Sequence, residues 1–170
     1  DGQRVRLTHV ISGDNTDTQA VVTFSLHCGR DSEVSLFQYH HHTMKRLAYI
    51  SAECARGASL TIDALVSSAP VARDMVWVDL AGDNTFHHHN LQLGAESDYM
   101  EMRVWMNHMG PKSESHHTAL SVLAGSSQSV QQSRAVIDVA ATECAIEQHV
   151  HARLISQKAS AVCQPDIKVN

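Results

Sequence analysis

The sequence has no concentration of basic residues, no long apolar run and few cysteines. Its formal net charge is −5 with histidine neutral, and without a basic stripe we do not expect a nucleic-acid partner. No run of about 18 apolar residues occurs, which argues against a membrane-spanning helix. The first residues, DGQRVRL, lack the apolar core of a signal peptide, so we expect a reduced, cytoplasmic setting.

The four cysteines, Cys28, Cys54, Cys144 and Cys163, form no Cys-x-x-Cys pair. Four cysteines in 170 residues are too few for a disulfide scaffold, although individual disulfides remain open. Cys54 and Cys144 fall on apolar faces of expected helices, where we predict that they behave as small buried hydrophobic residues.

The composition is that of a folded globular chain. Apolar residues make up 43% and charged residues 18%, which excludes a disordered composition. The length of 170 residues is enough for one hydrophobic core. We find no internal repeat, low-complexity tract or linker, and we therefore expect a single domain over residues 1–170.

Alternation of apolar and polar residues predicts most of the secondary structure as strands. Residues 20–39 are interpreted as a hairpin that follows a first strand and a turn. The strands that this pattern predicts cover residues 4–11, 20–27, 33–39, 60–66, 76–80, 99–106 and 117–125.

Two segments instead show helical spacing. Met44, Leu47, Ile50 and Cys54 recur on one face and predict a helix over 42–56, which Gly57 ends. A second apolar stripe predicts a helix over 129–157. Strands combined with one central and one C-terminal helix indicate an α+β fold with a mostly antiparallel sheet.

The segment TMKRLAYISAECARGASLTIDALVSSAPVARDMVWVDL (43–80) resembles the hotdog-fold acyl-CoA thioesterases, the acyl-CoA hydrolase branch. Met44 matches the methionine that opens the family's helix. Thr61 and Asp63 open the next strand, and Pro70 lies seven residues after Asp63, as the family pattern requires. The resemblance implies a hotdog-like fold, a curved antiparallel sheet around the helix 42–56, and assembly into a homodimer or higher homo-oligomer.

The resemblance also implies a function, namely thioester hydrolysis of acyl-CoA substrates without a required cofactor. Asp17 takes the place of the family's water-orienting Asn, and Asn15 stands at the family's Asp position. The helix N-terminus at His41 and His42 would be the oxyanion site. Glu53 is the only acidic residue in the expected helix. The alternative interpretations are that Asn15 and Asp17 only build a turn and that Glu53 is a solvated flank.

The chain departs from the family pattern where the chemistry would occur. Tyr39, His40 and His41 replace the family's Phe-Gly-Gly, and residues 23–38 and 82–97 are insertions. The fold is therefore expected to transfer better than the activity. A catalytically inactive, hotdog-like ligand-binding or assembly protein and a His-rich metal-dependent enzyme of another α+β fold remain as alternatives.

Histidine is unusually frequent, with thirteen copies that include the triplets 40–42 and 87–89. Three consecutive residues of an extended chain do not point the same way, so each triplet offers at most two metal ligands. His116, His149 and His151 add further donors, but the sequence does not show that they converge. We expect solvated or interface histidines and assign no metal site. Elemental analysis of the purified protein would distinguish these possibilities.

Overall fold

The computed structural model describes residues 1–13, 18–67 and 69–170, except for the side chain of His42. The described residues form strands and turns and contain no helix, so none of them makes a helix able to span a membrane. The twelve strands are β1 Arg4–Gly13, β2 Gln19–Cys28, β3 Glu33–His42, β4 Lys45–Cys54, β5 Ser59–Ser67, β6 Val71–Leu80, β7 Thr85–Gly94, β8 Tyr99–His108, β9 Glu114–Leu123, β10 Gln128–Ile137, β11 Ala145–Leu154 and β12 Ser160–Val169.

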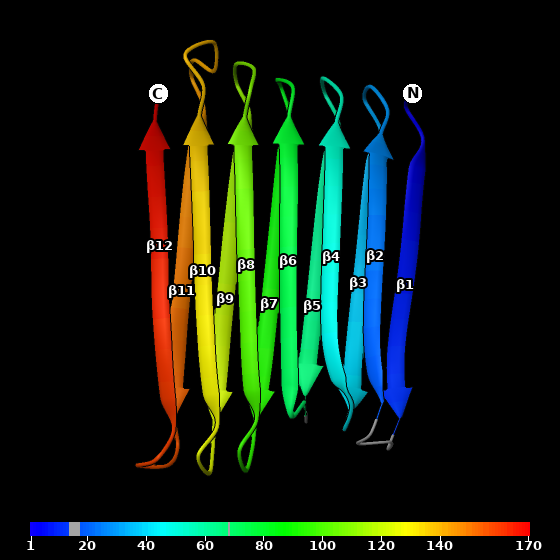
Figure 1. The fold of residues 1–170 in the computed structure, drawn as a ribbon. Coiled ribbons are helices and arrows are strands. Elements are labelled where there is room, and N and C mark those ends of the chain that lie inside the picture. The colour runs from blue at the N-terminus through cyan, green and yellow to red at the C-terminus, as the bar shows by residue number, and fades with distance from the viewer. Residues whose placement is uncertain (14–17, 68) are drawn as a thin grey trace.

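The strands alternate between two parallel sheets that lie face to face (Figure 1). The odd-numbered sheet has the order β1-β3-β5-β7-β9-β11, and the even-numbered sheet has the order β12-β10-β8-β6-β4-β2. We call an odd strand and the even strand that follows it a rung. Rungs stack in chain order and place the two termini at opposite ends, so the described chain is a β-solenoid (Figure 1).

The rungs repeat at an uneven spacing. His27 and Glu53, on neighbouring strands, are 26 residues apart, whereas the partners Arg134 and Asp166 nearer the C-terminus are 32 residues apart. The expectation that the chain has no internal repeat was therefore wrong. Turns of different length hide the period, although every strand stacks in register on the equivalent strand of the next rung.

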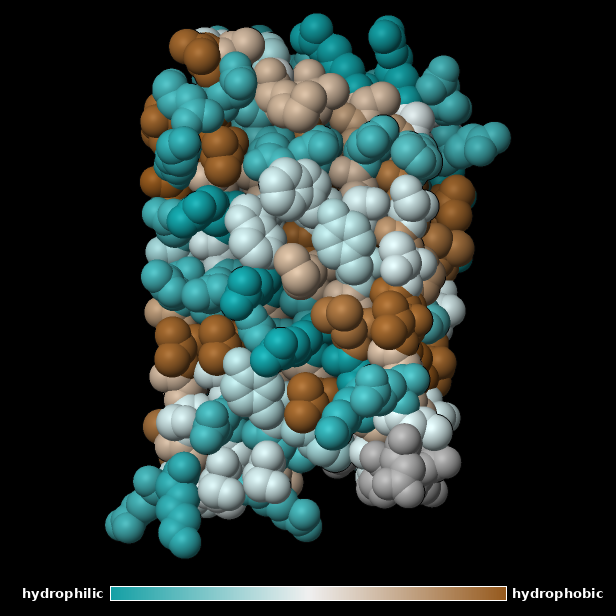
Figure 2. Space-filling model, viewed as in Figure 1, coloured by the Kyte–Doolittle hydropathy of each residue, from teal (hydrophilic) through white to brown (hydrophobic). Residues whose placement is uncertain are grey.

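The core lies between the sheets and is built by every second residue. In β5 the side chains of Leu60, Ile62, Ala64 and Val66 are buried, while the residues between them are more exposed. A single rung has too little apolar surface for an independent core, and stacking of neighbouring rungs buries a continuous one. The outer face of the even-numbered sheet mixes hydrophilic and hydrophobic side chains (Figure 2).

The predicted helix over 42–56 is wrong, because β4 occupies this segment. Its inward row is Arg46, Ala48, Ile50, Ala52 and Cys54, all of them buried. Arg46 is held by an ion pair with buried Asp74 on β6. The inward row of a strand is usually apolar and large, whereas this row contains an arginine and three small residues. The helical spacing of the apolar residues was therefore the clearer pattern in the sequence, and it led to the wrong prediction of a helix.

The predicted helix over 129–157 is also wrong, because β10 and β11 occupy it. The inward row of β10 includes Ser129, Gln131 and Ser133, so polar side chains interrupt the alternation of apolar residues. These side chains form hydrogen bonds across rungs, as where Gln131 Nε2 donates to Asn90 Oδ1 at 3.1 Å, although Gln131 Oε1 is buried without a partner. The segment 82–97, expected to be an inserted loop, contains β7.

The predicted antiparallel arrangement is wrong as well. β2 and β3, interpreted as a hairpin, belong to different sheets, and each pairs in parallel with a strand of the next rung. The turn between them contains Asp31 at φ 55°, a left-handed conformation that redirects the chain to the opposite sheet. An all-β parallel solenoid therefore replaces the α+β hotdog fold expected from the sequence.

Candidate functional site

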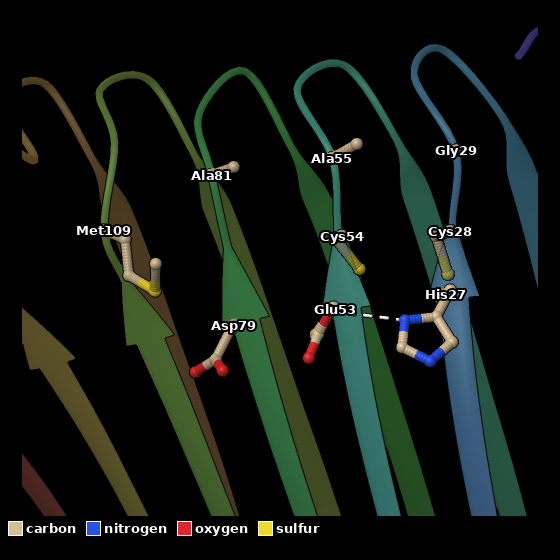
Figure 3. A pocket seen from close by; sticks show the side chains of 9 residues that line it. All are labelled: His27, Cys28, Gly29, Glu53, Cys54, Ala55, Asp79, Ala81 and Met109. Atoms are coloured by element: carbon tan, nitrogen blue, oxygen red, sulfur yellow. Dashed lines mark hydrogen bonds and ion pairs between the residues drawn. The ribbon is translucent and has the colours of Figure 1, made fainter.

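A pocket of about 530 Å³ lies where four even-numbered strands run into their turns (Figure 3). We call it the thiol pocket, because two cysteines line it. Its lining residues come from the ends of β2, β4 and β6 and from the turns after β2, β4, β6 and β8. They are His27, Cys28, Gly29, Glu53, Cys54, Ala55, Asp79, Ala81 and Met109.

Parallel register brings these lining residues together. Cys28 is the in-register partner of Cys54, and Cys54 is the partner of Leu80. The backbone ladder continues beyond the strand ends, since Ala55 N donates to Cys28 O at 2.9 Å and Ala81 N donates to Cys54 O at 3.1 Å. The first turn residues of successive rungs are thus held in a row, which gives the pocket a fixed wall.

The inner side of the pocket carries the two thiols. Cys28 and Cys54 are 3% and 2% exposed, and both are free thiols. A hydrogen bond from the Cys54 thiol lowers the pKa of Cys28, although burial acts in the opposite direction. The same hydrogen bond, followed by burial, raises the pKa of Cys54. Cys28 is therefore the thiol that ionises first, and Cys54 stays protonated as its donor.

The outer side of the pocket carries charged and polar groups, because residues alternate between the two faces of a strand. His27 Nδ1 lies 3.2 Å from Glu53 Oε2, and both side chains are exposed. On the next rungs, Asn107 Nδ2 donates to Asp79 Oδ1 at 2.6 Å. The two thiols thus lie on the inner face of the sheet and the two carboxylates on its outer face, and all four residues line one pocket without being grouped as ligands of one ion.

The structure brings one of the residues predicted from the sequence, Glu53, to this pocket. Asn15 and Asp17 lie outside the described residues. His41 and His42 end β3 at the edge of the sheets opposite the pocket, because odd and even strands run in opposite directions (Figure 1), and His41 Nδ1 lies 3.0 Å from Ser67 Oγ. The helix whose N-terminus was to form the oxyanion site is replaced by β4.

The sequence interpretation missed the pairing of Cys28 with Cys54. The two cysteines occur in the similar segments LHCGR and AECARG, each with a charged or ionisable residue before the cysteine and a glycine soon after it. Each cysteine is the last residue of a strand. The similarity of the two segments could have revealed that Cys28 and Cys54 are equivalent positions. It becomes apparent only when their 26-residue spacing is recognised as the period of a repeat.

Most of the histidines belong to the odd-numbered sheet, where they occur on both of its faces. His88 is buried and lies with its Nδ1 2.9 Å from Nδ1 of buried His117. Burial lowers the pKa of His117 to about 4, and it lowers the pKa of His88 as well. On the outside, His116 Nδ1 lies 2.9 Å from Glu147 Oε2. No group of three or more His, Cys, Asp or Glu residues within the described ranges is arranged to hold a metal ion.

Fold and pocket together define a class of protein, a parallel β-solenoid with a buried thiol pair at the end of its strands. A family model described as "SUF system FeS cluster assembly, SufBD core domain" matches residues 2–170. The chain therefore belongs to the SufBD core family. A search of curated proteins finds no match to the sequence.

This membership overturns the resemblance to acyl-CoA thioesterases. The predictions of thioester hydrolysis and of an acyl-CoA substrate are wrong, and the alternatives of an inactive hotdog-like protein or a His-rich α+β metalloenzyme are no better supported. The blocks that carried the resemblance, such as YMEMRVW, are short alternating strands. Such segments recur in many β-proteins, so their order along the chain was weak evidence for one family.

Proposed function

We propose that this protein works in the assembly of iron–sulfur clusters and that the Cys28–Cys54 pair is the site at which it handles iron and sulfide. The observation that carries the proposal is the family match over residues 2–170. The thiol pocket supports it, because cysteine thiolates are the usual ligands of iron–sulfur clusters. In this proposal the cluster is cargo that the protein passes on and not a resident cofactor.

The electrostatics of the pair suit this chemistry. A metal binds the thiolate form, and a cysteine with a lowered pKa supplies more thiolate near neutral pH. The lowered pKa of Cys28 therefore favours the first iron–sulfur bond at Cys28. Loss of the Cys54 proton as the metal approaches would supply the second ligand. A cluster with four thiolate ligands would take the others from a protein partner or from small-molecule thiols.

The carboxylates at the pocket mouth support delivery of the metal. Glu53 and Asp79 line the same pocket as the thiols. Negative charge in a concave site raises the local concentration of cations such as Fe²⁺. We propose that these two carboxylates attract iron to the mouth of the pocket and that the thiols behind them bind it.

We further propose that the protein acts with protein partners of an iron–sulfur assembly complex, in place of the acyl-CoA substrate expected from the sequence. We propose a cytoplasmic location, which the sequence also led us to expect. That location suits a protein whose four cysteines are all free thiols, because disulfides are rare in reducing compartments.

Anaerobic reconstitution with ferrous iron and sulfide tests the function. We expect the wild-type protein to retain iron and acid-labile sulfide after desalting, and the double variant Cys28→Ser/Cys54→Ser to lose most of both. Cys163→Ser is the matched control, because Cys163 is exposed on the C-terminal strand β12 and should not affect loading. Equal loading of the double variant would refute the site. Circular dichroism would show whether each variant is folded.

A further inference from the structure

Two histidines on the outer face of the odd-numbered sheet lie side by side on adjacent strands. His87 on β7 is the in-register partner of His116 on β9, and their rings stack with centroids 4.9 Å apart and planes 15° apart. His89, two residues further along β7, stacks on His87 with the centroids 6.2 Å apart. The parallel register of two inner strands of the sheet therefore brings imidazoles together at one place on the surface.

Solvent reaches these rings. In β7 the inward residue His88 is fully buried, whereas His87 and His89, on either side of it, point outward. The side chain of His116 is 33% exposed. The histidines belong to the odd-numbered sheet, whereas the thiol pocket is lined by even-numbered strands and the turns that follow them. The two places on the molecule are therefore separate.

A carboxylate engages one nitrogen of His116 and leaves the other available. His116 Nδ1 lies 2.9 Å from Glu147 Oε2 on β11. A neutral imidazole that donates its Nδ1 proton to a carboxylate presents a lone pair on Nε2, and this arrangement is usual for histidines that bind metal ions. His116 Nε2 also lies 4.0 Å from Glu114 Oε2. A second negative charge thus stands beside the available nitrogen, which favours a cation there.

We propose that His87 and His116 bind one divalent transition-metal ion on the outer face of the odd-numbered sheet. Imidazole is a suitable ligand for Zn²⁺, Ni²⁺ and iron. Metal–nitrogen bonds of about 2.0–2.1 Å require the two nitrogens to lie within about 4 Å of each other. Rings with centroids 4.9 Å apart reach this separation by rotating about their side-chain bonds. The described residues contain no preset group of three ligands, so the protein supplies two imidazoles and water completes the coordination.

The neighbouring carboxylates have different roles in this site. Glu147 is a positioning residue, because it acts through the ring of His116. Glu114 contributes negative charge next to the ion. An ion held between β7 and β9 links two neighbouring rungs, and it binds only where the folded register keeps the two histidines together. Binding should therefore raise the midpoint of thermal unfolding.

Calorimetric titration of the folded protein with Ni²⁺ near neutral pH tests the inference, because Ni²⁺ binds imidazole more tightly than Fe²⁺ does. We expect the wild type to bind one ion with the highest affinity, and His87→Gln and His116→Gln each to lose that binding. Glu147→Gln should weaken it by about tenfold. His41→Gln is the matched control and should bind as the wild type does. His41 is exposed on the same face, but its in-register neighbours are serines.

Chemical mapping of the wild type locates the ion without any variant. Diethyl pyrocarbonate modifies accessible imidazole nitrogens, and peptide mass mapping measures the rate at each histidine. Saturating Ni²⁺ should slow modification of His87 and His116 several-fold and leave that of His41 unchanged. Equal rates with and without Ni²⁺, or protection confined to other histidines, would overturn the inference. Undiminished binding by the folded double variant His87→Gln/His116→Gln would overturn it as well.

The variant Cys28→Ser/Cys54→Ser separates this site from the proposed function. It should bind Ni²⁺ as the wild type does, while it fails to retain iron and sulfide. Loss of Ni²⁺ binding in this variant, with its circular dichroism unchanged, would place the ion in the thiol pocket and refute the inference. Retention of iron and sulfide by the same variant would refute the proposed site of iron–sulfur chemistry and leave the histidine site standing.

Discussion

The buried ion pair between Arg46 on β4 and Asp74 on β6 gives the sharpest test of the solenoid interior. The Arg46 side chain is completely buried and that of Asp74 is 8% exposed. One contact joins them, from Arg46 Nη2 to Asp74 Oδ2. Burial raises the pKa of Asp74 to about 6, and the attraction of Arg46 lowers it only partly, so the pair is charged at pH 7.

Some polar atoms of the Arg46–Asp74 pair lack hydrogen-bond partners, and this determines how much each variant should change the free energy of unfolding. Arg46 Nε and Nη1 and Asp74 Oδ1 are buried without a hydrogen-bond partner. Removing one partner leaves the other charge buried and unpaired, so Arg46→Met should lower the free energy of unfolding by about 3–5 kcal/mol. Replacing both, in Arg46→Met/Asp74→Leu, should restore wild-type stability or exceed it by about 1–4 kcal/mol, since two desolvated charges disappear together.

Denaturant unfolding followed by circular dichroism at pH 7 measures these differences, with the wild type, both single variants and the double variant forming a cycle. The cycle should give a large favourable coupling between the two positions. A double variant as unstable as the weaker single variant would refute the reasoning, because the side chains would then act through shape and not through charge. A cost below about 1 kcal/mol for Arg46→Met would refute it as well.

Two further predictions concern the histidine pair and a turn. The folded-state pKa of His117 is about 4, below its value of 6.5 when unfolded, so its contribution to stability is present above pH 6.5 and is lost as the pH falls towards 4. The loss should reach about 3 kcal/mol, and pH-dependent unfolding should show a smaller loss in His117→Gln than in the wild type, because His88, whose pKa is also lowered, still contributes in the variant; an unchanged profile in the variant would contradict this assignment. At Gly57, with φ at 77°, an added Cβ would clash with Asp31 Oδ1, whereas at Gly2, with φ at 64°, it would meet nothing within 4 Å. Gly57→Ala should therefore lower the midpoint of thermal unfolding more than Gly2→Ala, which carries only the backbone strain of about 1 kcal/mol; equal shifts would contradict the crowding.

The sequence predicted the strands whose inward row is apolar. Leu60, Ile62 and Val66 in β5 and Met100, Met102 and Met106 in β8 show clear alternation and are buried as expected. Three of the strands that it missed have inward polar residues, namely Arg46 in β4, His88 in β7 and Gln131 in β10. Their partners lie on other rungs, and no local pattern shows that a polar side chain will meet a partner there.

The sequence could not predict whether neighbouring strands are parallel or antiparallel, and the reason is different. Alternation is the same in parallel and antiparallel sheets, so it could not distinguish a hairpin over 20–39 from strands of two sheets. The candidate site depended on the same information. Cys28 and Cys54 become neighbours only through the register of β2 on β4. Without that register the two cysteines were separate residues, and Cys54 was interpreted as a buried residue of a helix.

The most direct test of the account is the amount of iron and acid-labile sulfide that the reduced protein retains after anaerobic reconstitution. The account predicts that the wild type and Cys163→Ser retain both and that folded Cys28→Ser/Cys54→Ser retains neither. Full retention by the folded double variant would contradict the claim that the Cys28–Cys54 pair is the site of iron–sulfur chemistry.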